Sequence, residues 1–140
     1  MPSQTTLKRA RQAAREGKRP TTQAGEFVRE EMEHIRHGKH GARSTKQAIA
    51  IGLSKARRAG IKLPPPRPGQ VSEKTRQSAK SAYRAGQTGQ RRKLSSRRSR
   101  ATLKALKREG QKAAAPTALA RQARAAAARR RQGRSGASKA

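Results

Sequence analysis

Apolar residues recur with helical spacing mainly in one part of the chain, residues 24–61. In the first segment of this region, five apolar residues lie on or beside one face of a helical wheel: Ala24, Val28, Met32 and Ile35, with Phe27 at the edge. Glutamates near its start and basic residues near its end suit the helix dipole. The pattern predicts an amphipathic helix over about 25–37, which Gly38 and Gly41 end.

The second segment, "STKQAIAIGLSKARRAG", predicts another amphipathic helix over about 45–59. Ser44 and Gln47 make a capping-box pattern, and Gly60 has the composition of a helix stop. Its apolar positions recur at i, i+3, i+4 and i+7: Ile49, Gly52, Leu53 and Ala56. We expect this face to pack on the first helix, which makes a small helical hairpin over about 25–59.

The remaining chain is polar, and most of its few apolar residues are alanines. The stretch "LPPPRPG" reads as a stiff polyproline-type spacer. Four regions are therefore expected: a basic N-terminal arm at 1–20, the hairpin module at 21–62, a Pro-rich linker at 63–70, and a basic Ala/Arg/Ser-rich arm at 71–140. Helix signals in the last region, at 72–86, 99–109 and from Pro116 onward, have little apolar surface to bury, so these helices are expected to be exposed or nascent.

Composition favours flexibility outside the hairpin. The chain has 140 residues, with 37 Lys plus Arg against 7 acids, a formal net charge of +30, and only 31% apolar residues. Low apolar content with high net charge is typical of disorder. We therefore expect a mostly α fold with extensive disorder, in which basic, partly helical flexible arms flank the hairpin and the terminal "RSGASKA" is disordered.

Several function classes are disfavoured by the residue inventory. The chain has no cysteine, which excludes disulfides, zinc fingers and zinc knuckles. It has no Asp, no nucleophile elbow and no phosphate-binding glycine loop, so we expect neither an enzyme nor a cofactor. No apolar run reaches the length of a membrane span, and we expect a cytoplasmic protein that does not bind membranes.

The three histidines raise the question of a metal site, because His34, His37 and His40 lie within seven residues of one another. Glu30 and Glu33 share a helical face with two of them, and this spacing could present imidazole and carboxylate ligands to a divalent ion. A solvated polar face near a helix C-terminus is the favoured interpretation, because no second shell of hydrogen-bond partners is evident.

The basic residues are the strongest functional signal, because the cationic excess runs along the whole chain. Each Lys or Arg that neutralises a phosphate releases counterions, so a polycation binds nucleic acid without base recognition. We predict phosphate contacts in the hairpin from Lys46, Lys55, Arg57 and Arg58. The C-terminal arm adds Arg91, Arg92, Lys93, Arg97, Arg98, Arg100, Lys104, Lys107, Arg108, Arg121, Arg124, Arg129, Arg130 and Arg131.

Duplex DNA is the favoured ligand, bound without sequence preference as by a nucleoid-associated, compacting protein. The alternative is an RNA-binding or ribosome-associated basic protein. Single strands are disfavoured because Phe27 and Tyr83 are the only aromatics and stacking platforms need more. The hairpin could mimic a helix-turn-helix with Lys46 and Gln47 near the bases, but a plain hairpin is favoured because only two helices are evident. Ile51, on the polar side of its helix, indicates a weak homodimer contact.

The stretches "AGEFVREEMEHIRHGKHGARSTKQAIAIGLSKARRAGIKLPPP", "SRATLKALKREG" and "ALARQARAAAARRR" resemble a family of short, highly basic bacterial proteins of unassigned function. Such proteins are commonly labelled DNA-binding or histone H1-like. The resemblance implies a bacterial cytoplasm or nucleoid, and it transfers no catalytic residues. Residues 24–63 carry its most specific part.

Overall fold

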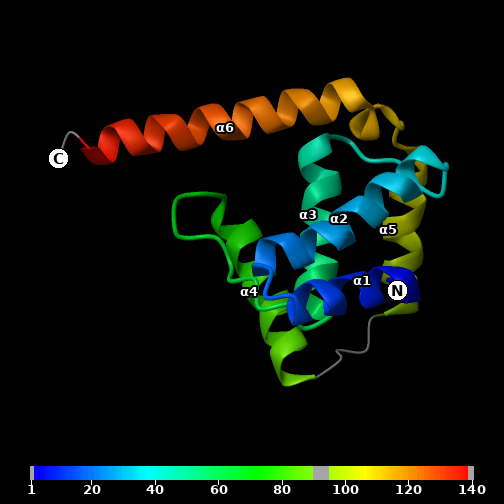
Figure 1. Cartoon of the computed structure of the whole chain (residues 1–140). Helices are drawn as coiled ribbons and strands as arrows, with labels where there is room; N and C mark the ends of the chain where they lie inside the picture. Colours follow the sequence, from blue (N-terminus) through cyan, green and yellow to red (C-terminus); the bar gives the residue numbers. More distant parts are fainter. Residues whose placement is uncertain (1, 90–94, 139–140) are drawn as a thin grey trace.

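The structure, a computed structural model, describes residues 2–89 and 95–138. The elements in chain order are α1 (Gln4–Arg15), α2 (Pro20–Arg36), α3 (Thr45–Arg58), α4 (Glu73–Thr88), α5 (Ser96–Arg108), the short 3-10 helix η1 (Lys112–Ala114) and α6 (Pro116–Ser138). Figure 1 shows α1, α2, α3 and α4 gathered together, while α6 extends away from them toward the C-terminus. The prediction of a mostly α fold is confirmed.

The helices α2 and α3 pack on each other and form the hairpin at the centre of the molecule. α3 has almost the predicted bounds, and its N-cap Ser44 accepts a hydrogen bond from the Gln47 backbone N–H at 3.1 Å. α2 begins at Pro20, five residues before the predicted start. Proline suits a first helical position, because its φ is already helical and its missing N–H would have no partner there.

Small side chains make the contact between α2 and α3. Ala48, Gly52 and Ala56 are buried at intervals of four residues, and a Cβ built on Gly52 would lie 2.7 Å from Val28 Cα. Ile49 and Leu53, predicted on this face, are half-buried, and each packs against a different apolar cluster. The helices approach so closely that only small residues fit between them, and the larger ones lie over neighbouring parts of the core.

Two apolar clusters flank this contact, and both draw on the predicted arms. One contains Met32, Ile35, Ala42, Ala48, Ala113 and Ala114, with Val28, Ile49 and Leu119 against it. The other contains Ala10, Ala24, Phe27 and Ala56, with Leu7, Leu53, Ile61 and Leu63 against it. The apolar core therefore extends beyond the predicted hairpin module at 21–62, because α1 and the segment from η1 to the start of α6 contribute to it.

α4 also joins the bundle, although its sequence predicts an exposed or nascent helix. Ala79 and Ala82 are buried as α4 packs on α3. Gly86 comes so close to the end of α3 that an added Cβ would overlap the Arg57 carbonyl oxygen, at 1.7 Å. Alanine and glycine bury little apolar area, but they allow two helix backbones to approach closely. The prediction considered only the apolar area of α4 and not this close approach.

The C-terminal region differs from the expected flexible arm, because helices cover most of its described residues. α5 has no buried residue, and α6 begins at Pro116, as predicted. Leu119 packs against the first cluster, while the rest of α6 carries mainly alanine and arginine, both strong helix formers. The backbone of 134–138 continues α6, contrary to the disorder expected for "RSGASKA", and residues 139 and 140 lie outside the described part.

Candidate functional site

α5 presents a stripe of cations on one face. Each member lies three or four residues from another member, the spacing that places side chains on one side of a helix. They are Arg97, Arg100, Lys104, Lys107 and Arg108, and all are exposed. At 1.5 Å per residue the stripe is about 16 Å long. Arg98, also predicted, is exposed but lies off this face.

The predicted cations of α6 are exposed as well, but they do not share a face. Their positions distribute them around the whole helix: Arg121, Arg124, Arg129, Arg130 and Arg131. Because the helix extends from the bundle, these side chains surround a projecting rod (Figure 1). Arg91, Arg92 and Lys93 lie outside the described residues.

The four predicted cations of the hairpin fall into two pairs. Lys46 and Arg58 are exposed on α3. Lys55 instead forms an ion pair with the fully buried Glu31. Arg57 is 7% exposed and donates from Nε and Nη2 to the Leu63 and Pro64 carbonyl oxygens, each at 3.2 Å. Burial lowers the pKa of Arg57 below its ordinary value. Lys55 and Arg57 therefore have intramolecular partners, and we leave both out of the candidate interface.

One side of the N-terminal end of α3 is in contact with η1, which bears on the helix-turn-helix alternative. Thr45 Oγ1 donates to the Ala113 carbonyl oxygen at 2.7 Å, so η1 lies against the first turn of α3. Gln47 Oε1 accepts a hydrogen bond from the Arg43 backbone N–H at 2.6 Å. The side-chain oxygen of Gln47 is therefore engaged in the turn before α3. A recognition helix presents this end to base edges, and here the chain itself lies against it.

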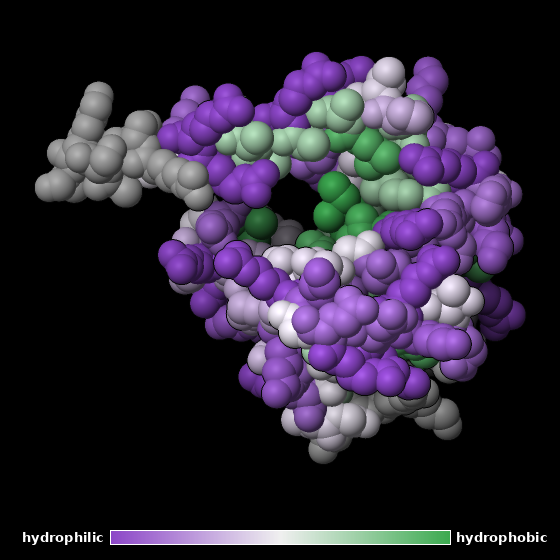
Figure 2. All heavy atoms as spheres, viewed as in Figure 1, coloured by the Kyte–Doolittle hydropathy of each residue, from purple (hydrophilic) through white to green (hydrophobic). Residues whose placement is uncertain are grey.

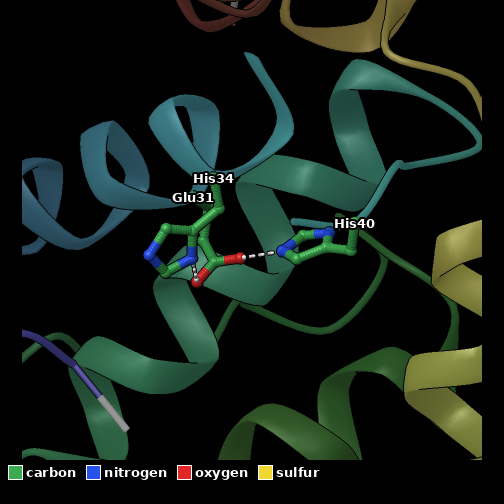
Figure 3. Close-up of side chains that lie close together, drawn as sticks. All are labelled: Glu31, His34 and His40. Atoms are coloured by element: carbon green, nitrogen blue, oxygen red, sulfur yellow. Dashed lines mark hydrogen bonds and ion pairs between the residues drawn. The ribbon is translucent and has the colours of Figure 1, made fainter. Parts of the chain in front are cut away.

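The sequence grouped His34 and His40 with His37, Glu30 and Glu33, whereas the structure brings the two histidines together around Glu31. We call Glu31, His34 and His40 the carboxylate–histidine cluster (Figure 3). One possible ligand atom from each lies within 4.8 Å of those of the other two. His40 Nε2 is 3.1 Å from Glu31 Oε2, and His34 Nδ1 is 3.7 Å from Glu31 Oε1. His37, which the sequence grouped with them, is exposed outside the cluster.

Both histidines of the cluster have an oxygen at the other ring nitrogen. His40 Nδ1 lies 2.9 Å from the Gly41 carbonyl oxygen, and His34 Nε2 lies 3.6 Å from Glu30 Oε1. Burial lowers the pKa of His34, although the charges of Glu31 and Glu30 act in the opposite direction. The neutral imidazole, which is the form that ligates metals, is thereby favoured at His34.

The proton positions at His40 follow from its two partners. A carbonyl oxygen can only accept, so Nδ1 carries a hydrogen and donates it to the Gly41 carbonyl oxygen. Nε2 then faces a carboxylate oxygen, which repels a bare lone pair. A positive charge between His40 Nε2 and Glu31 Oε2, either a proton or a metal ion, relieves that repulsion.

The outward side of α3 is hollowed between the charged residues. A hollow of about 380 Å³ is lined by Gln47, Ala50, Ile51, Ser54, Lys55 and Arg58. Figure 2 shows hydrophobic residues gathered on this face amid a largely hydrophilic surface. Ile51, which has no predicted partner in a monomer, is half-buried in this hollow.

No helix among residues 2–89 and 95–138 has the length and apolar character needed to cross a membrane. The model of a family of unknown function (DUF6496) matches residues 11–67. No curated protein and no solved structure matches the chain. Over α2, α3 and the carboxylate–histidine cluster, the chain is therefore similar to a family to which no activity is attached.

Proposed function

We propose that this protein binds duplex DNA without sequence preference and compacts it by neutralising phosphates, as a nucleoid-associated, histone H1-like protein would. The observation that carries the proposal is the cationic stripe of α5, five exposed Lys and Arg side chains on one helical face. α6 adds a projecting rod with cations on all sides. The rest of the molecule anchors both helices through the contacts of residues 106–119 with the bundle.

The energetic source of such binding is the release of counterions from DNA. The logarithm of the binding constant falls with the logarithm of salt concentration by about 0.9 for each phosphate neutralised. With a net charge of +30 on 140 residues, the chain has cations for many such contacts. Binding of this kind needs no base-reading side chain, so it does not depend on the N-terminal end of α3, where η1 lies against Thr45.

Single-stranded nucleic acid is a poorer fit. Binding of unpaired bases depends on aromatic faces that stack on them. Phe27 is 1% exposed in the core, and Tyr83 is half-buried on α4. Neither aromatic side chain of the sequence therefore offers a fully exposed face to a base.

The proposal is tested by fluorescence anisotropy with two unrelated DNA duplexes of equal length, over a series of salt concentrations. The test variant replaces four stripe residues with glutamine: Arg97, Arg100, Lys104 and Arg108. We expect equal affinity of the unmodified protein for both duplexes, and a variant whose salt slope is smaller by about 3 to 4.

A charge-matched control variant replaces four exposed cations of α1 with glutamine: Lys8, Arg9, Arg11 and Arg15. The control should change the slope less than the α5 variant. An equal decrease in both variants would contradict the assignment of the stripe and leave only net charge as the cause. No saturable binding to either duplex would refute the proposed function.

RNA binding, with a ribosomal or other structured RNA as partner, is the alternative, because the same cations attract any polyanion. Competition between duplex DNA and duplex RNA separates the two. A preference for RNA that survives raised salt would favour the alternative. The DNA proposal places the protein in the cytoplasm, at the nucleoid, and predicts no leakage from anionic vesicles.

Self-association through α3 stays a prediction. The hollow around Ile51 gives it a location on the outward side of the hairpin. Sedimentation equilibrium of the protein and of Ile51→Lys would test it, since a lysine in an apolar contact should leave only monomer.

A further inference from the structure

We propose that Glu31, His34 and His40 bind a divalent transition-metal ion, with Zn²⁺ the best match, and that the ion ties the loop after α2 to the bundle. Figure 3 shows the two imidazoles on either side of the Glu31 carboxylate, with His34 and Glu31 on α2 and His40 beyond its C-terminus. The inference is independent of nucleic-acid binding.

The donor set suits such an ion. Two imidazole nitrogens and one carboxylate oxygen are a frequent ligand set for Zn²⁺, and imidazole also suits Ni²⁺, Co²⁺ and Cu²⁺. Ligand atoms that share one ion at about 2.0–2.2 Å lie about 3 to 4 Å apart. His40 Nε2 lies 3.1 Å from Glu31 Oε2 and His34 Nδ1 lies 3.7 Å from Glu31 Oε1. Both distances fall in this range for a carboxylate that turns one oxygen toward each imidazole.

Each imidazole has an oxygen near its second ring nitrogen, which the sequence did not reveal. A metal-bound histidine usually directs its other ring nitrogen to a carbonyl or carboxylate oxygen, which sets the tautomer and the ring orientation. The Gly41 carbonyl oxygen is at hydrogen-bond distance from His40 Nδ1, 2.9 Å, and Glu30 Oε1 lies at an ion-pair distance from His34 Nε2, 3.6 Å. Glu30 is 6% exposed, and its Oε2 is buried with no hydrogen-bond partner among the described residues.

The local charge also favours a cation, although the whole chain is strongly basic. Four of the seven acids lie on α2 between residues 26 and 33, and two of them, Glu30 and Glu31, are buried. The competing positive charge is Lys55, whose ammonium group pairs with Glu31. Its side chain is 30% exposed, so it can turn toward solvent when an ion enters.

Binding would fasten more than the three ligands. Beyond His40 the chain runs against the C-terminal region: the Gly41 N–H donates to the Leu106 carbonyl oxygen at 2.8 Å, and the Ala42 N–H donates to the Gly110 carbonyl oxygen at 3.1 Å. A Cβ on Gly41 would lie 2.0 Å from the Glu109 carbonyl oxygen, so this approach is close. An ion held by His40 and α2 would therefore stabilise the segment that carries α5.

The test uses the full chain, stripped with a chelator and titrated with Co²⁺ and then Zn²⁺. We expect one Co²⁺ per chain with visible ligand-field absorption, displaced by one equivalent of Zn²⁺, and a higher Tm with Zn²⁺. His40→Gln and His34→Gln should each weaken binding at least about 100-fold, more than the removal of a hydrogen-bond partner behind a ligand does. His37→Gln is the matched control and should bind as the unmodified protein does, because His37 is exposed outside the cluster.

A second variant keeps the proposal falsifiable if a ligand variant fails to fold. Lys55→Met removes the competing cation without touching a ligand, so it should tighten Zn²⁺ binding by about tenfold or more, as expected for removing a unit charge a few ångströms from the ion. A cluster that serves only as a buried ion pair predicts no such gain. Absence of saturable binding, equal weakening by His37→Gln, or no gain with Lys55→Met would each overturn the proposal.

Discussion

Close packing at Gly52 shows how a residue without a side chain can be the centre of a helix contact. The Val28 backbone lies where a Cβ on Gly52 would be, at 2.7 Å from Cα and 3.0 Å from N. Neither backbone atom can move aside as the end of a flexible side chain could. The glycine is therefore required by the α2–α3 distance, not by its backbone conformation.

Gly52→Ala should destabilise the protein by about 1–3 kcal/mol, the usual cost of overpacking a core. The matched control is Gly25→Ala in α2, where a Cβ meets nothing within 4 Å. Alanine in that exposed helical position should stabilise by about 0.5–1 kcal/mol. Urea unfolding monitored by circular dichroism measures both, and a Gly52→Ala protein as stable as its parent would contradict the close contact.

Arg57 and Arg58 are neighbours in sequence with different surroundings. Arg57 is buried and donates to two carbonyl oxygens after α3, whereas Arg58 is exposed. Arg57→Gln should lower the free energy of unfolding by about 1–3 kcal/mol, because the two carbonyl oxygens are left without their donors. Arg58→Gln should change stability by less than about 0.5 kcal/mol. Urea unfolding of the two variants measures the difference.

The same pair separates stability from DNA binding. Arg58→Gln should reduce the salt slope by about 0.9 if Arg58 contacts a phosphate, and Arg57→Gln should not change it under conditions where the variant is fully folded. Anisotropy titrations of both variants check this, and a slope that falls only for Arg57→Gln would contradict the exclusion of Arg57 from the interface.

At the scale of the element, two serine N-caps make different contacts. Ser44 Oγ accepts from the Gln47 N–H at the start of α3, whereas Ser95, at the start of α5, makes no side-chain cap hydrogen bond. Ser44→Ala should therefore destabilise by about 1 kcal/mol, and Ser95→Ala should have no measurable effect. Thermal unfolding measures the stability of both variants. Equal stability of the two would show that the Ser44 cap does not stabilise α3.

The elements also show why the predicted arms differ from the structure. α1 and α4 have too little apolar surface to be stable helices alone. The sequence therefore predicts a flexible basic arm at 1–20 and an exposed or nascent helix at 72–86. Each gains its stability from alanines that fit against the hairpin: Ala10 on α1, and Ala79 and Ala82 on α4. These alanines are buried only because another helix packs closely against them. The sequence of a single segment does not show which other segment packs on it.

For the whole molecule, the boundary between core and projecting arm falls within α6. Leu119 belongs to the packed part, and the predicted cations from Arg121 onward are exposed. Ending the chain after Ala120 removes seven Lys and Arg, and none of the removed residues whose burial is described belongs to either apolar cluster. This truncation should leave the midpoint of urea unfolding nearly unchanged and reduce the salt slope of DNA binding by about 0.9 for each phosphate that the removed cations neutralise.

Ending the chain after Arg108 provides the contrast. It also removes Ala113, Ala114 and Leu119 from the first cluster, and the Ala113 carbonyl that accepts from Thr45. Without this apolar burial the protein should be less stable by at least about 2 kcal/mol. Equal stability of the two truncated proteins would show that the η1 segment does not contribute to the core.

The sequence by itself determined what depends on neighbours along the chain. The spacing of apolar residues in 24–56 predicted the two hairpin helices, Ser44 predicted the cap of α3, and Pro116 predicted the start of α6. These features follow from periods of three to four residues and from local hydrogen bonds. The excess of Lys and Arg likewise needed no structure to suggest a polyanionic partner.

Only the tertiary structure decided which polar residues are free and which are held. Lys55 and Arg57 have the same composition signal as Lys46 and Arg58, but contacts with Glu31 and with the chain after α3 bury or pair them. His40 joins Glu31 and His34 because the loop after α2 folds back, whereas His37 does not. Such assignments depend on distances between residues far apart on the helical wheel or in the chain, and helical periodicity carries no information about those distances.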